Sequence, residues 1–359
     1  MYFVPTEYRY RGPMTRALIT GITGQDGAYL AKRLYDIGYT VAGILRRTSV
    51  PGQLKKLEWV FGGKIPESIE LFYSDLTDAP SLTRIVHDFV PDEVYNLAAQ
   101  SHVGISFQSP VSTATANALG PMNVLEACRS MGSDAPRFYQ ASTSEMFGKV
   151  QECPQNEATP FYPRSPYGVA KLFSYWLTVN YRESYDLFGC NGILFNHESP
   201  IRGENFVTKK ITQGLAQILK GKKEFIELGN LEAKRDWGHA SDYVDAMWRM
   251  MQQEKPEDYV IATGMQHSVR QFCEVAADRL NLNLEWQGER EHEVGYSRTL
   301  GQAIIRVSPQ YYRPAEVETL LGDPRKALKQ LRWLPKYTFE TLVQEMIDHD
   351  LLEQSGGLS

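Results

Sequence analysis

Two short segments of the chain carry side chains that could perform acid–base chemistry. Tyr167 and Lys171 are four residues apart, so on a helix they share one face about one turn apart. An ammonium favours the charged phenolate, and we expect Lys171 to bring the pKa of Tyr167 closer to neutral. Glu145, at the end of the Ser-Thr-Ser-Glu run 142–145, adds a second base. One base for an O–H proton and one for a C–H proton predict oxidation followed by elimination.

Apolar strands alternate with helices through the first half of the chain. This alternation predicts an α/β fold built on a doubly wound parallel Rossmann sheet. Glu145 then lies just past the carboxyl end of a strand, the edge at which such sheets bind ligands. Ser165 and Pro166 predict the N-cap and first turn of the helix that carries Tyr167. The expected strands are 17–20, 40–45, 70–73, 93–98 and 137–141, and the expected helices are 28–37, 80–89, 115–132 and 167–185.

A glycine-rich turn follows the first expected strand and precedes the first helix. Gly21, Gly24 and Gly27 permit a tight turn and close backbone approach, and the helix N-terminus favours a pyrophosphate. Glycine also simply makes turns, but strand, turn, helix and second strand in this order predict a dinucleotide site.

The end of the second expected strand indicates which dinucleotide binds. An NAD site usually has an acidic residue there for the ribose 2′-hydroxyl. This chain has Arg46 and Arg47, followed by Thr48 and Ser49, and two guanidiniums with two hydroxyls suit a 2′-phosphate. The sequence therefore predicts NADP, with a solvated basic loop as the alternative.

A second, smaller and mostly C-terminal domain is expected from about residue 196, where the pattern loosens. Helices are expected at 209–219, 269–280 and 339–352, and the chain is expected to return to the sheet near 236–263. We predict an NADP-binding domain of residues 15–195 plus about 236–263. The substrate domain takes about 196–235 plus 264–352, and residues 1–14 form an extension.

Composition narrows the class of protein. The 359 residues carry a formal net charge of −5, which argues against a general binder of nucleic acid or membrane surfaces. The four cysteines form no C-x-x-C pair, so free thiols in a reducing cytosol are expected, with neither disulfides nor a metal. No run of 18 apolar residues is present, and residues 1–13 lack the apolar stretch of a signal peptide. We expect a cytoplasmic enzyme.

Seven motifs extend these expectations. The chain has, in this order, a glycine-rich cofactor motif, a Ser/Thr-rich strand end and Tyr-x-x-x-Lys. This arrangement resembles that of the short-chain dehydrogenase/reductase superfamily. Together the motifs resemble the GDP-mannose 4,6-dehydratase family, from about residue 16 to near the C-terminus. They are GITGQDG (21–27), NLAAQSH (96–102), QASTSEMFG (140–148), TPFYPRSPYG (159–168), FNHESP (195–200), KRDWGHA (234–240) and YYRPAEV (311–317).

The resemblance implies an extended short-chain fold, tightly bound NADP and a redox-neutral dehydration. Tyr167 would deprotonate the sugar 4-hydroxyl as hydride leaves carbon 4, with Lys171 holding the nicotinamide ribose and Thr143 bonding the oxygen on carbon 4. The new ketone makes the proton on carbon 5 acidic, and Glu145 would remove it. Water would leave from carbon 6, where the hydride returns, giving the 4-keto-6-deoxy sugar nucleotide.

The resemblance also implies two sets of binding residues, one for the cofactor and one for the GDP-sugar, and it implies no metal ligands. For the cofactor they are Gly21, Thr23, Gly24, Gln25, Asp26, Gly27, Arg46, Arg47, Ser49, Asp75, Leu76, Leu97, Ala98, Ala99, Gln100, Ser101, Tyr167, Lys171, His197 and Arg202. For the GDP-sugar they are Ser101, Thr143, Ser144, Glu145, Asn196, Asn205, Lys210, Arg235, Arg313 and Glu316.

Two departures from the family pattern bear on assembly and substrate. Family members commonly have a Tyr where this chain has Ser112, and the stretch 50–64, which helps to build tetramers, is divergent. A homodimer and a homotetramer both stay open. A GDP-manno-heptose substrate also stays open. Two other functions stay open as well: a GDP-4-keto-sugar reductase or epimerase, and a non-catalytic binder. A reductase or epimerase needs the Tyr and Lys but no base for carbon 5, so Glu145 favours the dehydratase.

Overall fold

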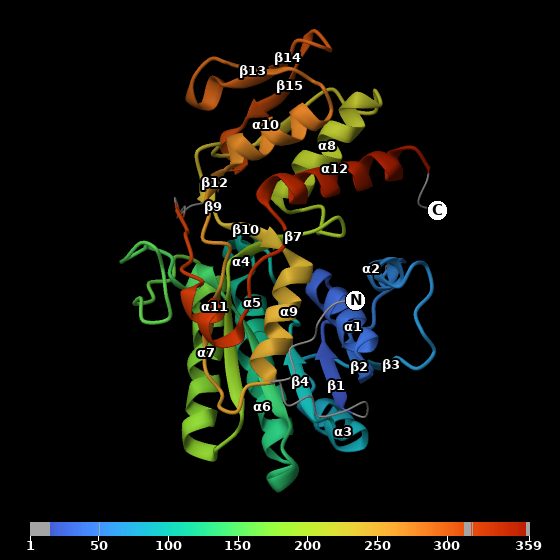
Figure 1. The fold of residues 1–359 in the computed structure, drawn as a ribbon, viewed down its shortest axis with the longest axis vertical. Coiled ribbons are helices and arrows are strands. Elements are labelled where there is room, and N and C mark those ends of the chain that lie inside the picture. The colour runs from blue at the N-terminus through green and yellow to red at the C-terminus, as the bar shows by residue number, and fades with distance from the viewer. Residues whose placement is uncertain (1–14, 50, 312–316, 318, 357–359) are drawn as a thin grey trace.

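Seven parallel strands form the central sheet, in the order β11-β6-β5-β4-β1-β2-β3 (Figure 1). The structure is a computed structural model and describes residues 15–49, 51–311, 317 and 319–356. The predicted doubly wound parallel sheet is confirmed. The strands are β1 (Arg16–Thr20), β2 (Thr40–Leu45), β3 (Glu70–Tyr73), β4 (Glu93–Asn96), β5 (Arg137–Thr143), β6 (Gly189–Leu194) and β11 (Tyr259–Ile261).

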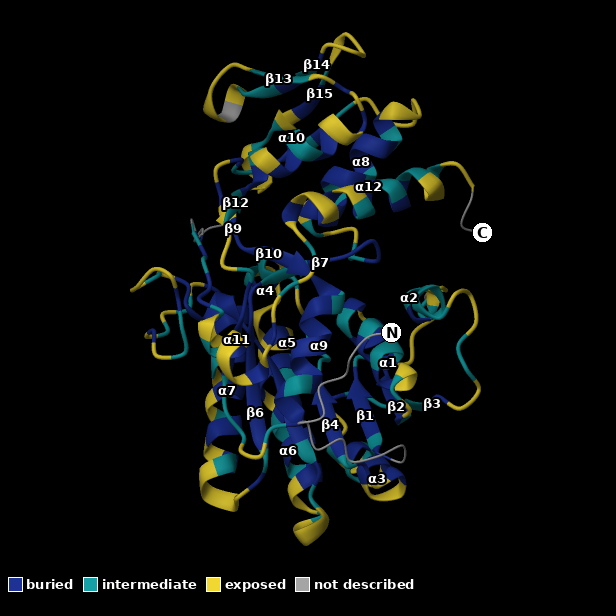
Figure 2. Cartoon of the chain, viewed as in Figure 1, coloured by how far each residue is buried: buried dark blue, intermediate teal, exposed yellow. Residues whose placement is uncertain are grey.

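Helices cover both faces of this sheet, which is why its inner strands are nearly continuous apolar runs. Successive residues of β1 point to opposite faces: Ile19 packs under α1 (Gln25–Asp36) and α9 (Ala240–Met251). Leu18 packs under the other layer, formed by α3 (Ala79–Phe89), α6 (Gly120–Arg129) and part of α7 (Pro166–Tyr185). Figure 2 shows the inner strands buried between these layers.

Local sequence sets where the helix bearing Tyr167 begins. The Ser165 hydroxyl accepts the Gly168 N–H at 3.0 Å, and Pro166 takes the first helical position, where a missing N–H costs nothing. The predicted N-cap is therefore confirmed. This cap starts α7 directly after Ser165 and so sets the position of Tyr167 in the first turn of the helix.

The helix expected at 115–132 is interrupted. The structure has α5 (Pro110–Ala114), a π-helical turn η1 (Thr115–Leu119) and then α6, with the Gly120 N–H reaching the Thr115 carbonyl. Pro121 has no N–H to give to the carbonyl of Asn117, four residues earlier. That carbonyl instead accepts the hydroxyl of Ser174 on α7, at 2.5 Å. The interruption thus ties η1 to the helix of Tyr167 and Lys171.

A second group of elements has its own apolar core. It lies at the top of Figure 1, beyond the parallel sheet, and combines three helices with a four-stranded sheet in the order β13-β14-β15-β8. The helices are α8 (Val207–Leu219), α10 (Val269–Arg279) and α12 (Phe339–Gln354), and the strands are β8 (Ile226–Leu228), β13 (Leu284–Gln287), β14 (Val294–Ser297) and β15 (Gln302–Val307).

Two short strand pairs lie between these groups: β7 (Asn196–Glu198) with β10 (Trp237–His239), and β9 (Lys234–Arg235) with β12 (His267–Ser268). The chain returns to the large sheet through α9 and β11, as expected. Within the described ranges, no helix combines the length and apolar character needed to cross a membrane. The remaining short elements are α2 (Lys55–Val60), α4 (Val103–Gln108), α11 (Arg325–Leu331), η2 (Gly132–Asp134), η3 (Ser144–Met146), η4 (Arg290–His292) and η5 (Pro309–Tyr311).

Candidate active site

A cavity of about 1040 Å³ lies where the carboxyl ends of the parallel strands meet the second group of elements. Most of the predicted site residues converge on it, although they extend along the sequence from Asp26 to Arg235. The predicted residues that line it are Asp26, Leu97, Ala99, Ser101, Thr143, Ser144, Glu145, Tyr167, Lys171, Asn196, His197, Arg202, Asn205, Lys210 and Arg235.

The proposed acid–base residues share one wall of this cavity. Strand β5 ends at Thr143, whose hydroxyl accepts the Glu145 N–H at 3.2 Å and so turns the chain into η3. The Tyr167 hydroxyl hydrogen-bonds to Thr143. All four side chains, including Lys171, are at least nine-tenths buried. The arrangement places a carboxylate and a phenol beside the same enclosed volume.

The expected effect of Lys171 on Tyr167 is wrong for this arrangement. Burial raises the pKa of Tyr167 to about 12, with the Thr143 hydrogen bond acting in the opposite direction. Burial also lowers the pKa of Lys171 to about 8. The physical reason is geometric: Lys171 Nζ donates to the Ala141 carbonyl at 2.9 Å and lies 5.9 Å from the Tyr167 ring centroid. Spacing put the two residues on one face but did not fix the direction of the ammonium.

The glycine-rich turn between β1 and α1 has the backbone shape of a phosphate cradle. Gly21 has a φ of +72°, and a Cβ there would stand 2.9 Å from the Ala98 backbone. A Cβ on Gly27 would stand 2.2 Å from the Gly21 carbonyl oxygen. No side chain caps the first turn of α1, which starts after Gly24. The Gly21 and Gly24 N–H groups are used within the protein, on the Ile44 and Gly21 carbonyls. The uncapped first turn of α1 is thus the part of the motif that suits an anion such as a pyrophosphate.

The basic residues predicted to select NADP lie where the sequence suggested. Arg46, Arg47 and Ser49 are exposed directly after β2, next to Asp75 at the end of β3. The Asp75 carboxylate accepts the N–H and hydroxyl of Thr77, which lowers its pKa, with Arg46 as a smaller cause. Leu76 was also predicted to bind the cofactor, but its side chain packs in the core under α6.

The segment after β4 runs past the end of β1. The Thr20 hydroxyl accepts the N–H groups of Leu97 and Ala98, each at 3.1 Å. Two hydrogen bonds of 2.8 Å join the backbone of Gln100 to the side chain of Asn117 in η1. Ser101 is exposed and lines the cavity. These bonds hold 97–101 as one wall of the cavity beside the glycine-rich turn.

His197 and Asp26 form an ion pair between β7 and α1, with 2.8 Å between Nε2 and Oδ2. Burial opposes ionisation of both groups, but the pairing wins. The pKa of Asp26 is lowered to about 2, and that of His197 is raised. Gln25 reinforces the junction by donating to the His197 carbonyl at 3.1 Å and accepting from Ser199 at 2.8 Å. The predicted cofactor positions thus tie the glycine-rich turn to the segment that enters the second group.

Cationic side chains from the segment 202–235 line the same cavity. The Arg202 guanidinium is 2.9 Å from the Glu198 carboxylate and lies over the Phe206 ring at 3.6 Å. Lys210 Nζ lies 3.4 Å from the centroid of Tyr311. Arg235 is buried and donates to the Lys234 carbonyl at 2.8 Å. Arg313 and Glu316, also predicted to bind substrate, lie outside the described residues.

Several cavity residues were not predicted as site residues. His102, Phe206 and Tyr311 line it. His102 and Tyr311 do fall within the quoted motifs, at positions where the sequence pattern alone assigned no chemistry. His102 contacts Asn205 and Tyr311 contacts Lys210, each across about a hundred residues of sequence.

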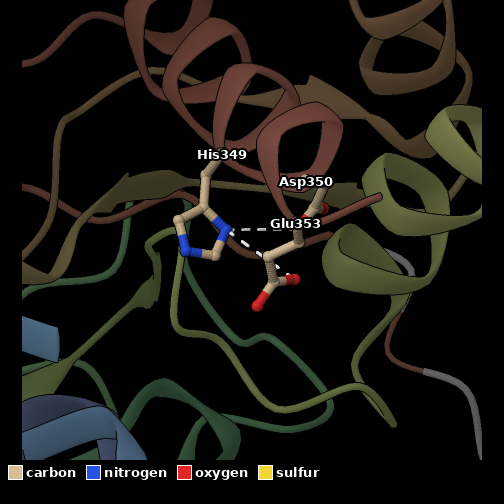
Figure 3. Close-up of side chains that lie close together, drawn as sticks. All are labelled: His349, Asp350 and Glu353. Carbon is tan, nitrogen blue, oxygen red and sulfur yellow. Dashed lines mark hydrogen bonds and ion pairs between the residues drawn. The ribbon is translucent and has the colours of Figure 1, made fainter. Parts of the chain in front are cut away.

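Figure 3 shows the described group of His, Cys, Asp and Glu residues that comes closest to a metal-binding arrangement. On α12, His349 Nδ1 is 3.4 Å from Asp350 Oδ1 and 4.0 Å from Glu353 Oε2. The Lys209 ammonium pairs with the same Asp350 oxygen and also donates to the Pro200 carbonyl at 2.7 Å. Because a fixed cation already balances the buried carboxylate, we assign no metal to this group.

Comparison with known proteins agrees with this geometry. Residues 18–346 match the family model described as GDP-mannose 4,6 dehydratase. A GDP-mannose 4,6-dehydratase of Vibrio cholerae serotype O1 is 53% identical over 348 residues, covering 93% of each chain. GDP-mannose 4,6 dehydratase 2 of Caenorhabditis elegans is 54% identical over 342 residues, covering 93% of this chain and 88% of that protein.

Solved structures show the same fold. A Thermus thermophilus UDP-glucose 4-epimerase in complex with NAD superposes with a TM-score of 0.76 at 25% identity, covering 94% of this chain and 99% of the other. From the family match and the two close relatives, the chain belongs to the GDP-mannose 4,6-dehydratase family.

Proposed function

We propose that the protein is a hydro-lyase that converts GDP-D-mannose to GDP-4-dehydro-6-deoxy-D-mannose and water with bound NADP. One observation carries this proposal: the carboxylate of Glu145 and the phenol of Tyr167 lie buried on one cavity wall, with Thr143 between them. A reductase or an epimerase has no use for the second base. The relatives named above are GDP-mannose 4,6-dehydratases, which favours this substrate over GDP-D-glycero-D-manno-heptose.

The chain's own residues fit NADP. Gly21 and Gly27 pack too closely against neighbouring backbone to carry a Cβ, which keeps the turn before α1 tight. Arg46, Arg47 and Ser49 supply positive charge and a hydroxyl for a 2′-phosphate. The other residues proposed to hold it are Thr23, Gly24, Gln25, Asp26, Asp75, Leu76, the segment 97–101, Tyr167, Lys171, His197 and Arg202. Bound NADP supplies reversible two-electron chemistry, which oxidises carbon 4 and later reduces carbon 6 without net consumption.

Tyr167 and Thr143 act at the oxygen of carbon 4. In the structure the Tyr167 hydroxyl is bonded to Thr143, so an incoming sugar hydroxyl would meet both groups together. Tyr167 accepts the hydroxyl proton, and Thr143 holds the oxygen as it becomes a carbonyl. Because burial raises the pKa of Tyr167 to about 12, this side chain needs nearby positive charge to act as a base near neutral pH.

Glu145 acts at carbons 5 and 6. A ketone at carbon 4 acidifies the proton on carbon 5, and the Glu145 carboxylate is the buried base on the same wall. The same carboxyl group can pass that proton to the departing hydroxyl of carbon 6, which then leaves as water. When hydride returns to carbon 6, carbon 5 regains a proton from Glu145 after this carboxylate has taken one up from solvent.

We assign the binding of the GDP moiety and sugar to the cationic side of the cavity. The proposed residues are Ser101, Ser144, Asn196, Asn205, Lys210 and Arg235, together with Arg313 and Glu316. Arg235 and Lys210 suit a pyrophosphate because they present positive charge from two different elements. We propose that residues 15–195 plus about 236–263 bind NADP and that about 196–235 plus 264–352 bind the GDP-sugar. Within the second range, Ala327, Leu331 and Trp333 pack in the core under α1 and α9 and not in the second core.

We also propose that the protein works as a cytoplasmic homodimer or homotetramer. Its four cysteines are free, which suits a reducing compartment. Val169, Phe173 and Trp176 form an exposed apolar stripe on α7, and Val111 and Leu119 are exposed on the neighbouring α5 and η1. Such a stripe suits a symmetric contact with a second copy. Sedimentation of the purified chain tests this, and a monomer at all concentrations would contradict it.

The test of function is product analysis from GDP-mannose. The purified protein should form a product with the ultraviolet signature of a 4-keto sugar in base, with no net change in NADPH and one solvent deuterium at carbon 5 in heavy water. Offering GDP-manno-heptose in competition tests the sugar. Net oxidation or reduction of the cofactor would instead identify a reductase.

A further inference from the structure

His102 bridges the two groups of elements at the cavity. It follows the 97–101 wall and comes directly before α4. Its Nε2 lies 3.3 Å from the main-chain carbonyl oxygen of Asn205, more than a hundred residues further along the chain. Both residues line the cavity. The imidazole is therefore a direct polar link between the cofactor side and the substrate side.

The hydrogen bonds fix which ring nitrogen carries the proton. His102 Nδ1 accepts the Ile105 N–H at 3.1 Å and caps α4, so this nitrogen must present its lone pair. The proton of the neutral ring is then on Nε2, where it can be donated to the Asn205 carbonyl. The two ring nitrogens thus have separable tasks: one caps a helix and the other makes the bridge.

A chain of hydrogen bonds connects the backbone of His102 to α7, the helix that bears Tyr167. Ser174 on α7 holds Asn117 in η1, and Asn117 holds the backbone of Gln100. The Gln100 side chain in turn accepts the His102 N–H at 2.5 Å and donates to the His102 carbonyl at 3.1 Å. Ser174 and Asn117 are fully buried. His102 is therefore held from behind by the same helix that bears Tyr167 and Lys171.

The segment on the far side of the bridge carries two proposed ligand residues. Residues 202–206 form a turn closed by a 3.1 Å bond from the Phe206 N–H to the Gly203 carbonyl. Arg202 lies over the Phe206 ring at 3.6 Å, and that ring is 5.9 Å from the His102 ring. Asn205 is exposed toward the cavity and has its carbonyl held by His102. Fixing this carbonyl limits where the Asn205 side chain can reach.

We propose that His102 is a positioning residue for the nucleotide-sugar: it holds the 202–206 turn, and through it Asn205, against the cofactor side of the cavity. It takes no proton from substrate. This inference rests on the proposed function, since the ligand held by Asn205 is a GDP-sugar. It predicts that loss of the bridge weakens substrate binding while the chemical step is kept.

Two substitutions separate the tasks of the ring nitrogens. His102→Asn places a polar atom at the position of Nδ1, so it keeps the cap of α4 and loses the bridge. His102→Gln places an amide N–H at the position of Nε2, so it keeps the bridge and loses the cap. His87→Asn is the matched control, because His87 is exposed on the distant helix α3, where its Nε2 lies 2.9 Å from the Ser130 hydroxyl. The variants are compared by steady-state kinetics with GDP-mannose and by amide hydrogen exchange of the ligand-free protein.

We expect His102→Asn to raise KM for GDP-mannose about fivefold, the effect of one lost hydrogen bond, with kcat within about twofold. Amides of 202–206 should exchange faster in this variant, whereas His102→Gln and His87→Asn should match the wild type in both measurements. Equal exchange in His102→Asn and wild type, or an unchanged KM, would overturn the inference. A wild-type enzyme without turnover would refute the proposed function instead, and the exchange measurement would still decide whether His102 holds the turn.

Discussion

His197 Nε2 lies 2.8 Å from Asp26 Oδ2, which joins the first turn of α1 to β7. The pairing favours the ionised form of both groups, because the pKa of Asp26 is lowered and that of His197 is raised. A charged imidazole donates from both nitrogens, and His197 Nδ1 is 2.8 Å from the Phe195 carbonyl. His197 thus fixes the strand from which Asn196 enters the cavity, and it stacks on Tyr243 with 4.5 Å between ring centroids.

This ion pair predicts a defined pH dependence of stability. The Asp26 pKa moves from 3.8 to about 2, so its contribution, about 2 kcal/mol, is present above pH 4 and is lost as the pH falls toward 2. The His197 pKa is raised, so its contribution is complete below about pH 6.5 and is lost as the pH rises through the raised value. Asp26→Asn should lower the melting temperature most between these limits, and NMR should show a lower His197 pKa. An unchanged His197 titration would contradict the pairing.

Glu145→Gln tests the second base. The amide keeps the size of the side chain but cannot accept the carbon 5 proton, so kcat should fall by about 10² to 10⁴. Cofactor binding should stay near the wild-type value because Glu145 is not among the residues proposed to hold NADP. Turnover is followed by the 4-keto product, with Glu67→Gln, an exposed surface substitution, as control. Wild-type turnover with deuterium at carbon 5 would exclude Glu145 from this role.

Lys171→Met should stabilise the protein and abolish activity. Burial lowers the Lys171 pKa to about 8, so below that pH folding forces a charge into an apolar site. The unfolded chain holds the proton more tightly, and wild-type stability therefore rises between about pH 8 and 10.5. Methionine removes this cost, which amounts to about 1–3 kcal/mol at pH 7. The Ala141 carbonyl keeps its bond from Gln140.

The gain should appear in chemical denaturation at pH 7 and shrink as the pH approaches 10.5. A variant less stable than the wild type at pH 7 would show that the bond from Lys171 to Ala141 outweighs desolvation.

Arg46→Asp combined with Arg47→Ala tests the choice of cofactor. Both guanidiniums are exposed after β2, and their loss should weaken NADP by about 10- to 100-fold while NAD changes much less. Binding is measured by calorimetry with each dinucleotide. Arg84→Asp, an exposed charge reversal on α3, is the control for net charge. Equal losses for NADP and NAD would remove these residues from 2′-phosphate recognition.

Much of the fold was readable from local pattern. Strand 40–45 was predicted with the bounds that the structure shows, because a buried parallel strand must be apolar along its whole length. The bounds predicted for strand 70–73 are also those of the structure, although this edge strand is exposed at Glu70 and Tyr73. The helix that carries Tyr167 was readable from Ser165 and Pro166, whose effects act within one turn. The π turn at 115–119 was missed, although Pro121 signals it, because helical periodicity does not report which carbonyls lack a donor.

The sequence by itself determined the alternating strands and helices of the first half of the chain, the glycine-rich turn and the choice of Thr143, Glu145, Tyr167 and Lys171 as candidate catalytic residues. These depend on residue type and on short spacings that the backbone obeys locally. The sequence did not predict the four-stranded sheet of the second group. Only the tertiary structure decided that the Lys171 ammonium turns to Ala141, that Asp26 pairs with His197, and that His102 reaches Asn205. Those contacts join distant segments, and their directions depend on which buried donor and acceptor remain available after the core has packed.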